Sequence, residues 1–268
     1  MADMADQASH ATLDYSVADR VAYATLCLPD TGNALTERTL DEINDVVARV
    51  QQDTSVRVLV LRGQRDVFSI GIDPEVLATL YSDIEFYEHI LTRVAALGLS
   101  LEALDVPVIA AINGTAREVG FDLALACDLI VIADEATIGD GRATTGRVPG
   151  GGATVRLPRA VGVLHAREIL FSGRMLSGTE AAALGLALRS VPLAALDDAV
   201  AELTATLTDK SREAQATIKR QINGSLGLDT PSAIEHERSE IIRHVSDPQS
   251  DAVEGLRAER EGRPPSWA

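Results

Sequence analysis

The sequence predicts an α/β fold with mainly parallel strands, and two observations support this prediction. Short apolar runs typical of buried strands occur at 56–61 (VRVLVL), 106–112 (VPVIAAI) and 129–133 (LIVIA). Segments of helical periodicity separate these runs, as expected for parallel strands joined by helical crossovers. The later part of the chain is almost wholly helical in pattern. We therefore expect a core over 13–196 followed by a helical region over 197–268.

The elements before the first buried run can be assigned in order. Residues 1–12 lack apolar patterning and are expected to form a flexible tail. The alternating stretch 20–28 (RVAYATLCL) predicts a strand, and the PDTGN sequence at 29–33 is typical of a turn. A helix is predicted over 36–51 because apolar residues recur on one face. That face carries Leu40, Ile43, Val46, Val47 and Val50.

The remaining core elements follow the same alternation. The segment 68–73 is expected to be a short loop that leads into a helical stretch near 74–82. Further helices are predicted over 84–104 and 119–127 from their apolar periodicity. The glycine-rich turn after Pro149 leads into another helix. Each predicted strand is thus followed by a loop and a helix.

Composition and charge exclude several classes of protein. The formal net charge of −16 argues against nucleic acid or an anionic membrane surface as the main partner. No apolar run approaches the ~20 residues that a membrane helix needs, and the acidic N-terminus lacks the features of a secretory signal. Cys27 and Cys127 lie in apolar runs and are expected to be buried, reduced thiols. No Cys/His cluster has zinc spacing, so we predict no metal site. Because the sequence shows neither a secretory signal nor a membrane-spanning run, we predict a cytoplasmic protein.

Two loops have the features of a catalytic site. The segments 68–73 (FSIGID) and 113–122 (NGTAREVGFD) each follow a buried strand and precede a helix. Such junctions leave backbone N–H groups free to bind an anion. If the loops face one another, two N–H groups can hold one carbonyl oxygen as an oxyanion hole. The alternative is that both are ordinary loops between a strand and a helix.

Several ordered motifs resemble the crotonase superfamily, which includes the enoyl-CoA hydratases and isomerases. They are NALTERTLDEI, VRVLVLRGQRDVFSIGID, PVIAAINGTAREVGFDLALACDLIVIADEATIG and GRVPGGGATVRLPRAVG. The resemblance implies a spiral of ββα units with a helical C-terminal region, and a homotrimer or a dimer of trimers. It also implies chemistry on an acyl thioester, with the N–H groups of Ile72 and Val119 as oxyanion donors. The family commonly has glycine at the position of Val119. Ile70, Gly71 and Gly120 are the implied substrate-binding neighbours.

Departures from the family pattern affect the two acid/base positions. Family hydratases use two glutamates, which correspond here to Asp122 and Arg142. Arg142 has three open interpretations: an ion pair with Asp122 or Asp140 that lowers the carboxylate pKa, recognition of a substrate anion, or a surface position. Asp140 is a second acid/base candidate. Glu118 is a third, although a solvated loop charge is the simpler interpretation.

The cofactor implied by the resemblance is coenzyme A, carried as part of the substrate rather than bound permanently. Many family members place a lysine near the CoA phosphates just after the Phe-x-x-Gly-x-Asp motif, where this chain has Pro74 and Glu75. Arg257, Arg260 and Arg263 near the C-terminus are alternative phosphate contacts.

The predicted function is therefore that of an enoyl-CoA hydratase/isomerase family enzyme with one catalytic carboxylate. A positioned acid or base contributes roughly 10²–10⁴ in rate. Isomerisation, dehydration or decarboxylation of an acyl thioester then fits better than efficient hydration. Two alternatives remain open. One is a carbon–carbon bond hydrolase of a cyclic diketone, although Gly151 stands where that branch has an aspartate. The other is a non-catalytic acyl-CoA-binding protein.

Overall fold

The protein folds around a six-stranded sheet in the order β1-β2-β3-β5-β7-β10. This computed structural model describes residues 12–80 and 82–267. β1 pairs antiparallel with β2, and every other neighbouring pair in the sheet is parallel. The strands are β1 (Leu13–Ala18), β2 (Val21–Leu26), β3 (Val58–Gly63), β5 (Val108–Ile112), β7 (Leu129–Ala133) and β10 (Arg189–Val191). The predicted α/β architecture with mainly parallel strands is confirmed.

A second sheet of four very short strands has the order β4-β6-β8-β9. Its strands are β4 (Val67–Ser69), β6 (Thr115–Arg117), β8 (Thr137–Gly139) and β9 (Leu176–Ser177). In three successive units the first strand joins the large sheet and the second joins the small one: β3/β4, β5/β6 and β7/β8. Helical structure follows each pair, so the ββα repeat implied by the family resemblance is present.

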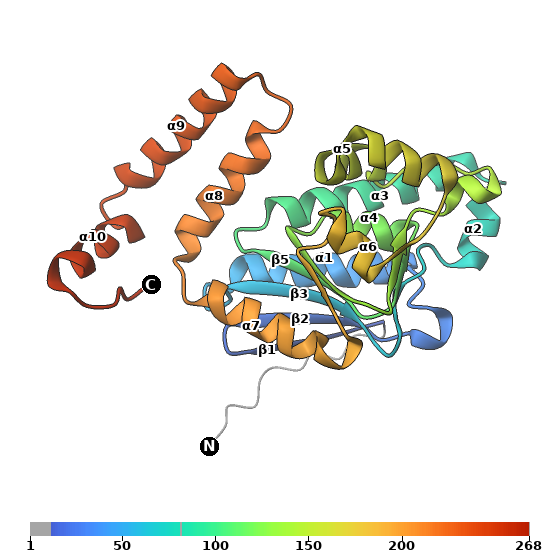
Figure 1. Cartoon of the computed structure of the whole chain (residues 1–268), viewed down its shortest axis with the longest axis horizontal. Helices are drawn as coiled ribbons and strands as arrows, with labels where there is room; N and C mark the ends of the chain where they lie inside the picture. Colours follow the sequence, from blue (N-terminus) through green and yellow to red (C-terminus); the bar gives the residue numbers. More distant parts are fainter. Residues whose placement is uncertain (1–11, 81, 268) are drawn as a thin grey trace.

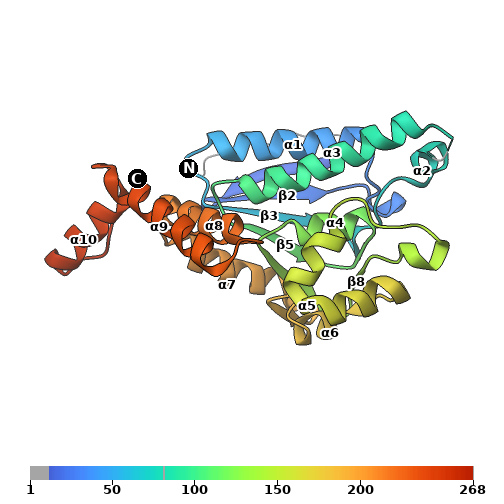
Figure 2. The same cartoon turned by 90° about the horizontal axis from the view of Figure 1, so that it is seen from above.

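Helices cover both faces of the large sheet. Figure 2 shows α1 and α3 along one face and α7 on the other, consistent with the contacts of α1 with β2 and of α7 with β3. The α-helices are α1 (Glu37–Gln52), α2 (Pro74–Leu80), α3 (Ile84–Ala103), α4 (Val119–Leu125), α5 (Ala153–Ser172), α6 (Gly178–Ala183), α7 (Leu196–Thr208), α8 (Arg212–Ser225), α9 (Thr230–Ser246) and α10 (Asp251–Glu261). Short 3₁₀ turns are η1 (Pro29–Thr31), η2 (Arg142–Thr145) and η3 (Leu193–Ala195).

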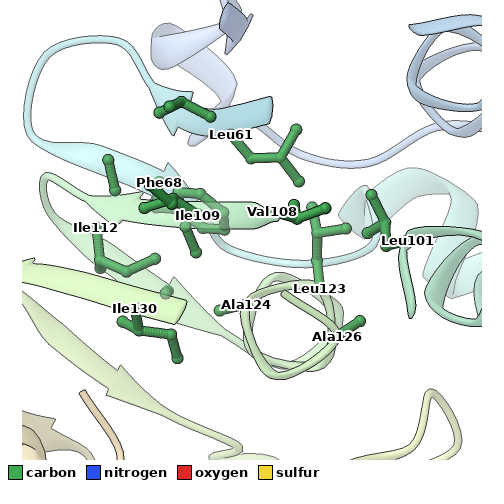
Figure 3. Packing of buried hydrophobic residues seen from close by; sticks show 14 of the residues in the cluster. Leu61, Phe68, Leu101, Val108, Ile109, Ile112, Leu123, Ala124, Ala126 and Ile130 are labelled. Carbon is green, nitrogen blue, oxygen red and sulfur yellow. The ribbon is translucent and has the colours of Figure 1, made fainter. Parts of the chain in front are cut away.

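The core lies between the central strands and these helices. Every residue of β5 is buried, because this strand has helices on both faces. Figure 3 shows Phe68 beside Ile109 of β5, and Leu123 of α4 directed toward Val108. This packing holds α4 beside β5.

The last three helices form an arm that extends away from the core (Figure 1). α8 and α9 pack against each other, and the arm leaves large apolar side chains exposed, such as Ile222, Ile234 and Ile242. The helical pattern predicted for the C-terminal region is confirmed. α7 begins that region, but it packs on the core and buries Leu196 and Val200.

Several local predictions need correction. The second strand of each unit lies in a segment that was expected to be a loop, and β1 was not expected, because its single buried face is weakly patterned. Residues 1–11 of the expected tail lie outside the described residues, whereas Thr12 is buried and donates to Glu42. Cys27 and Cys127 are free but partly exposed. No helix of the described part is long and apolar enough to cross a membrane.

Candidate active site

The two loops singled out in the sequence lie directly against each other. Gly71 has a φ of +100°, and a Cβ placed on it would come within 3.0 Å of the Val119 backbone nitrogen. Gly120 packs more closely still, because a Cβ there would lie 2.3 Å from the Ser69 carbonyl oxygen. Glycine at these two positions is therefore required for the close approach of the loops.

This arrangement leaves two backbone donors free. The Leu35 N–H donates to the Gly71 carbonyl (2.7 Å) and the Leu35 carbonyl accepts from Asp73 (3.1 Å), which fixes the backbone on either side of Ile72. Val119 begins α4, so its own N–H has no acceptor inside the helix. Within residues 12–80 and 82–267, neither the Ile72 N–H nor the Val119 N–H donates to a protein acceptor.

A strained turn at Glu118 sets the position of Val119. Glu118 has φ 54° and ψ −120°, a conformation that a residue with a side chain rarely adopts. Its N–H donates to the Asp140 carbonyl (3.2 Å), and its own carbonyl accepts from the Asp122 N–H (3.0 Å). The turn is thus held from both sides.

Arg142 binds both aspartates that were predicted as acid/base candidates. Its Nη2 lies 2.9 Å from Asp122 Oδ2, and its Nη1 lies 2.5 Å from Asp140 Oδ2. Asp122 Oδ1 accepts from the Ala153 N–H at 2.8 Å, and Asp140 Oδ1 accepts from the Arg142 N–H at 3.0 Å. Arg142, Asp122 and Asp140 are 6%, 2% and 1% exposed, so the interpretation of Arg142 as a surface residue is wrong. The ion pair of the first interpretation is present, and it involves both aspartates.

The electrostatic effect on Asp122 is opposite to the one expected from the sequence. Burial raises the pKa of the Asp122 carboxyl above its ordinary value, and the attraction of Arg142 only partly opposes that effect. Burial also acts to lower the pKa of Arg142, but Asp122 and Asp140 outweigh it and the pKa ends above its ordinary value. Asp122 is therefore a carboxylate whose charge is disfavoured by burial and sustained by one arginine.

Sequence reasoning treated Glu118 as a solvated loop charge, and the structure corrects this. Glu118 is only 6% exposed. Its two carboxylate oxygens accept from Arg147 Nη1 and Nη2 at 2.8 and 2.6 Å, and Arg117 lies 3.7 Å away. Arg147 was not predicted, because it stands 29 positions from Glu118 in the chain and has no periodic signal.

Two small cavities open beside the loops. The larger has a volume of about 30 Å³ and includes Ile72, Glu118, Val119, Arg142 and Arg147 in its lining. Apolar residues of α2, α3 and the loop before α5 complete that lining: Leu77, Tyr87, Ile90, Leu91, Val94, Val148 and Gly150.

The smaller cavity, of about 10 Å³, is lined by Asp122 and Gly151 together with Val94 and Val119. Ile70, Gly71 and Gly120 line neither cavity. Their predicted contact with substrate stays a prediction, since they lie in the packed contact between the loops.

The described residues provide no group of three or more His, Cys, Asp or Glu placed to hold a metal ion. Pro74 and Glu75, at the positions for which the family resemblance implies a lysine, begin α2. The C-terminal arginines lie on or near α10, which stands at the opposite end of the molecule from α2 (Figures 1 and 2). Arg263 is paired with Glu254 and Glu261.

Comparisons with known proteins identify the family. The family model for enoyl-CoA hydratase/isomerase matches residues 17–268. The human "Enoyl-CoA hydratase domain-containing protein 2, mitochondrial" is 35% identical over 89% of this chain and 82% of its own. Rat "Methylglutaconyl-CoA hydratase, mitochondrial" is 32% identical over 88% of this chain and 75% of its own.

Solved structures give the same result. The crystal structure of an enoyl-CoA hydratase from Bacillus anthracis superposes with a TM-score of 0.90 at 29% identity, covering 96% of this chain and 98% of the other. That of an enoyl-CoA hydratase from Mycobacterium smegmatis gives 0.89 at 30% identity, covering 96% and 99%. The chain belongs to the enoyl-CoA hydratase/isomerase family.

Proposed function

We propose that this protein is a lyase or isomerase that acts on an acyl thioester through an enolate held in an oxyanion hole. The observation that carries the proposal is the pair of unpartnered N–H groups, of Ile72 and Val119, on two loops in direct contact. The reaction classes that fit best are double-bond isomerisation, dehydration and decarboxylation. Each of them passes through an enolate or dienolate of the thioester, with the negative charge on the same carbonyl oxygen.

The chain's own backbone supplies the stabilisation of that enolate. The thioester oxygen accepts hydrogen bonds from the Ile72 and Val119 N–H groups, and these bonds strengthen as negative charge develops. One such donor contributes about 3–4 kcal/mol to the transition state. The bonds of Leu35 and the turn at Glu118 fix both donors before substrate arrives. No reorganisation is then needed during the reaction.

Efficient hydration is not favoured, because Arg142 replaces the second family carboxylate and is committed to Asp122 and Asp140. The family resemblance assigns the remaining acid/base role to Asp122, and Asp140 is a second candidate. On that assignment, Asp122→Asn lowers turnover at least tenfold. Recognition of a substrate anion by Arg142 would require it to release one of these aspartates.

The size of the larger cavity supports a short acyl group. A cavity needs roughly 10–15 Å³ to hold one water molecule, so about 30 Å³ accepts only a small group without movement of α2 or α3. We propose coenzyme A as the thiol part of the substrate.

We further propose that the protein is a homotrimer or a dimer of trimers. The arm of α8–α10 and its exposed apolar side chains support this proposal. α10 lies far from α2 in the same chain. In such an assembly, Arg257 and Arg260 would therefore contact the CoA phosphates of a neighbouring copy rather than those bound to their own chain.

A second candidate function is non-catalytic binding of an acyl-CoA. The small cavities and the engagement of both aspartates by Arg142 favour it. It shares the site with the first proposal and differs only in turnover.

The test is a panel of C4 thioesters incubated with the purified protein in D₂O and followed by mass spectrometry. Butyryl-CoA reports α-proton exchange, 3-butenoyl-CoA isomerisation, crotonyl-CoA hydration, 3-hydroxybutyryl-CoA dehydration and methylmalonyl-CoA decarboxylation. We expect α-proton exchange together with at least one of three reactions: isomerisation, dehydration or decarboxylation. Binding without any turnover supports the second candidate, and neither binding nor turnover rejects both.

A further inference from the structure

We propose that Glu118 is a catalytic acid/base of this site and that Asp122 is a positioning residue behind it. The inference rests on the proposed thioester activity. It changes which carboxylate exchanges a proton with the substrate, and it identifies a residue that the family alignment does not point to.

The two cavities separate the two carboxylates. Glu118 lines the larger cavity together with Ile72 and Val119, which carry the two free N–H groups. Asp122 lines the smaller one. Val94 and Val119 line both, so the two spaces are adjacent. A thioester held by both donors in the larger cavity therefore meets Glu118, whereas Asp122 borders only the smaller cavity.

The two carboxylates also differ in the solvent exposure of the arginine that binds each of them. Asp122 is bound by the guanidinium of Arg142, whose side chain is 7% exposed, and by a backbone N–H at the start of α5. Glu118 is bound by Arg147, whose side chain is 20% exposed, and both arginines line the larger cavity. A carboxylate has about four acceptor positions, so the two bonds from Arg147 orient Glu118 and leave lone pairs for a substrate proton.

The backbone at Glu118 also points to a role for its side chain. A residue with a side chain in this region of φ and ψ costs about 1–3 kcal/mol, and such strain is concentrated at functional sites. Glycine would satisfy the turn without that cost. The turn is held by backbone bonds to Asp140 and Asp122. The Asp122 side chain binds Arg142 and the Ala153 N–H beside the site, which gives Asp122 its positioning role.

The proposed step is balanced within the substrate and Glu118. The Glu118 carboxylate takes the proton from Cα of the thioester, and the C–H electron pair forms the C=C bond of the enolate. The carbonyl π pair moves to the oxygen held by Ile72 and Val119. The resulting Glu118 carboxylic acid returns its proton to Cα, or to Cγ when the double bond shifts.

The experiment measures α-deuterium incorporation into butyryl-CoA in D₂O for wild type, Glu118→Gln, Glu118→Asp and Asp122→Asn. A positioned acid/base contributes roughly 10²–10⁴ in rate, so Glu118→Gln should lower exchange at least 100-fold at unchanged KM. Glu118→Asp keeps a carboxylate and should recover at least a tenth of the wild-type rate. Asp122→Asn should lose only about tenfold, less than Glu118→Gln.

The matched control is Glu102→Gln, which removes another glutamate bound to an arginine at 2.6 Å but outside the site. It should exchange at the wild-type rate. Exchange by Glu118→Gln above a tenth of wild type, with Asp122→Asn reduced 100-fold, overturns the assignment and leaves the proposed function intact. A wild-type protein that binds butyryl-CoA without exchange rejects the enolate chemistry itself, and with it this assignment.

Discussion

Replacement of Arg142 by methionine tests whether the buried charges beside the oxyanion loops depend on one guanidinium. The substitution keeps the length of the aliphatic stem but leaves Asp122 and Asp140 buried without their cation. Both aspartates are almost fully buried, at 2% and 1% exposure. Removing one partner of a buried ion pair typically costs about 3–5 kcal/mol, because the remaining charge is uncompensated.

We therefore expect Arg142→Met to lower the free energy of unfolding by about 4 kcal/mol, close to a 1,000-fold change in the ratio of folded to unfolded protein. For a chain of this size, the melting temperature should fall by about 8–16 °C. The assay is urea denaturation at fixed protein concentration, since assembly also contributes to apparent stability. A triple variant that combines Arg142→Met with Asp122→Asn and Asp140→Asn should recover more than half of the lost free energy of unfolding.

The matched control is Arg238→Met, in which the arginine is 69% exposed and pairs with Glu235 on the same helix. An exposed pair of this kind contributes about 0–1 kcal/mol. If Arg142→Met costs no more than this control, or if neutralising both aspartates recovers nothing, the three side chains are not the coupled buried network described above.

Three further predictions concern neighbouring positions. Gly151→Ala places a Cβ about 2.5 Å from Asp122 Oδ2, so overpacking should cost about 1–3 kcal/mol in urea unfolding; an unchanged midpoint would contradict it. Glu118→Gly should be more stable than Glu118→Ala by about 1 kcal/mol, because both lack the carboxylate and only glycine relieves the positive φ; equal stabilities would argue against strain. Burial acts to raise the pKa of Glu42, but hydrogen bonds from Thr12 and the Arg38 contacts outweigh it and the pKa ends below its ordinary value of 4.5. Its stabilising contribution is then present above that value and lost as pH falls through the native-state pKa, so wild type should lose more stability on acidification than Glu42→Gln in unfolding curves from pH 6 to 3.

The sequence by itself determined the parallel strands, the helices and the family. Continuous apolar runs such as the one that forms β5 are stable only where both faces of a strand are covered. The apolar periodicity over α1 indicates an amphipathic helix. Both signals are local, because each depends on neighbouring residues within one element. The short strands β4, β6 and β8, of three residues each, have too few positions to show a period.

Only the tertiary structure decided how the charged residues pair. Arg142 and Asp122 are 20 positions apart, and Glu118 and Arg147 are 29 apart. Whether two such charges bind, and whether burial or attraction dominates the pKa of Asp122, depends on distances and solvent exposure that no local pattern contains. The same holds for Val119, which lines two cavities, while the sequence shows only that glycine is absent there.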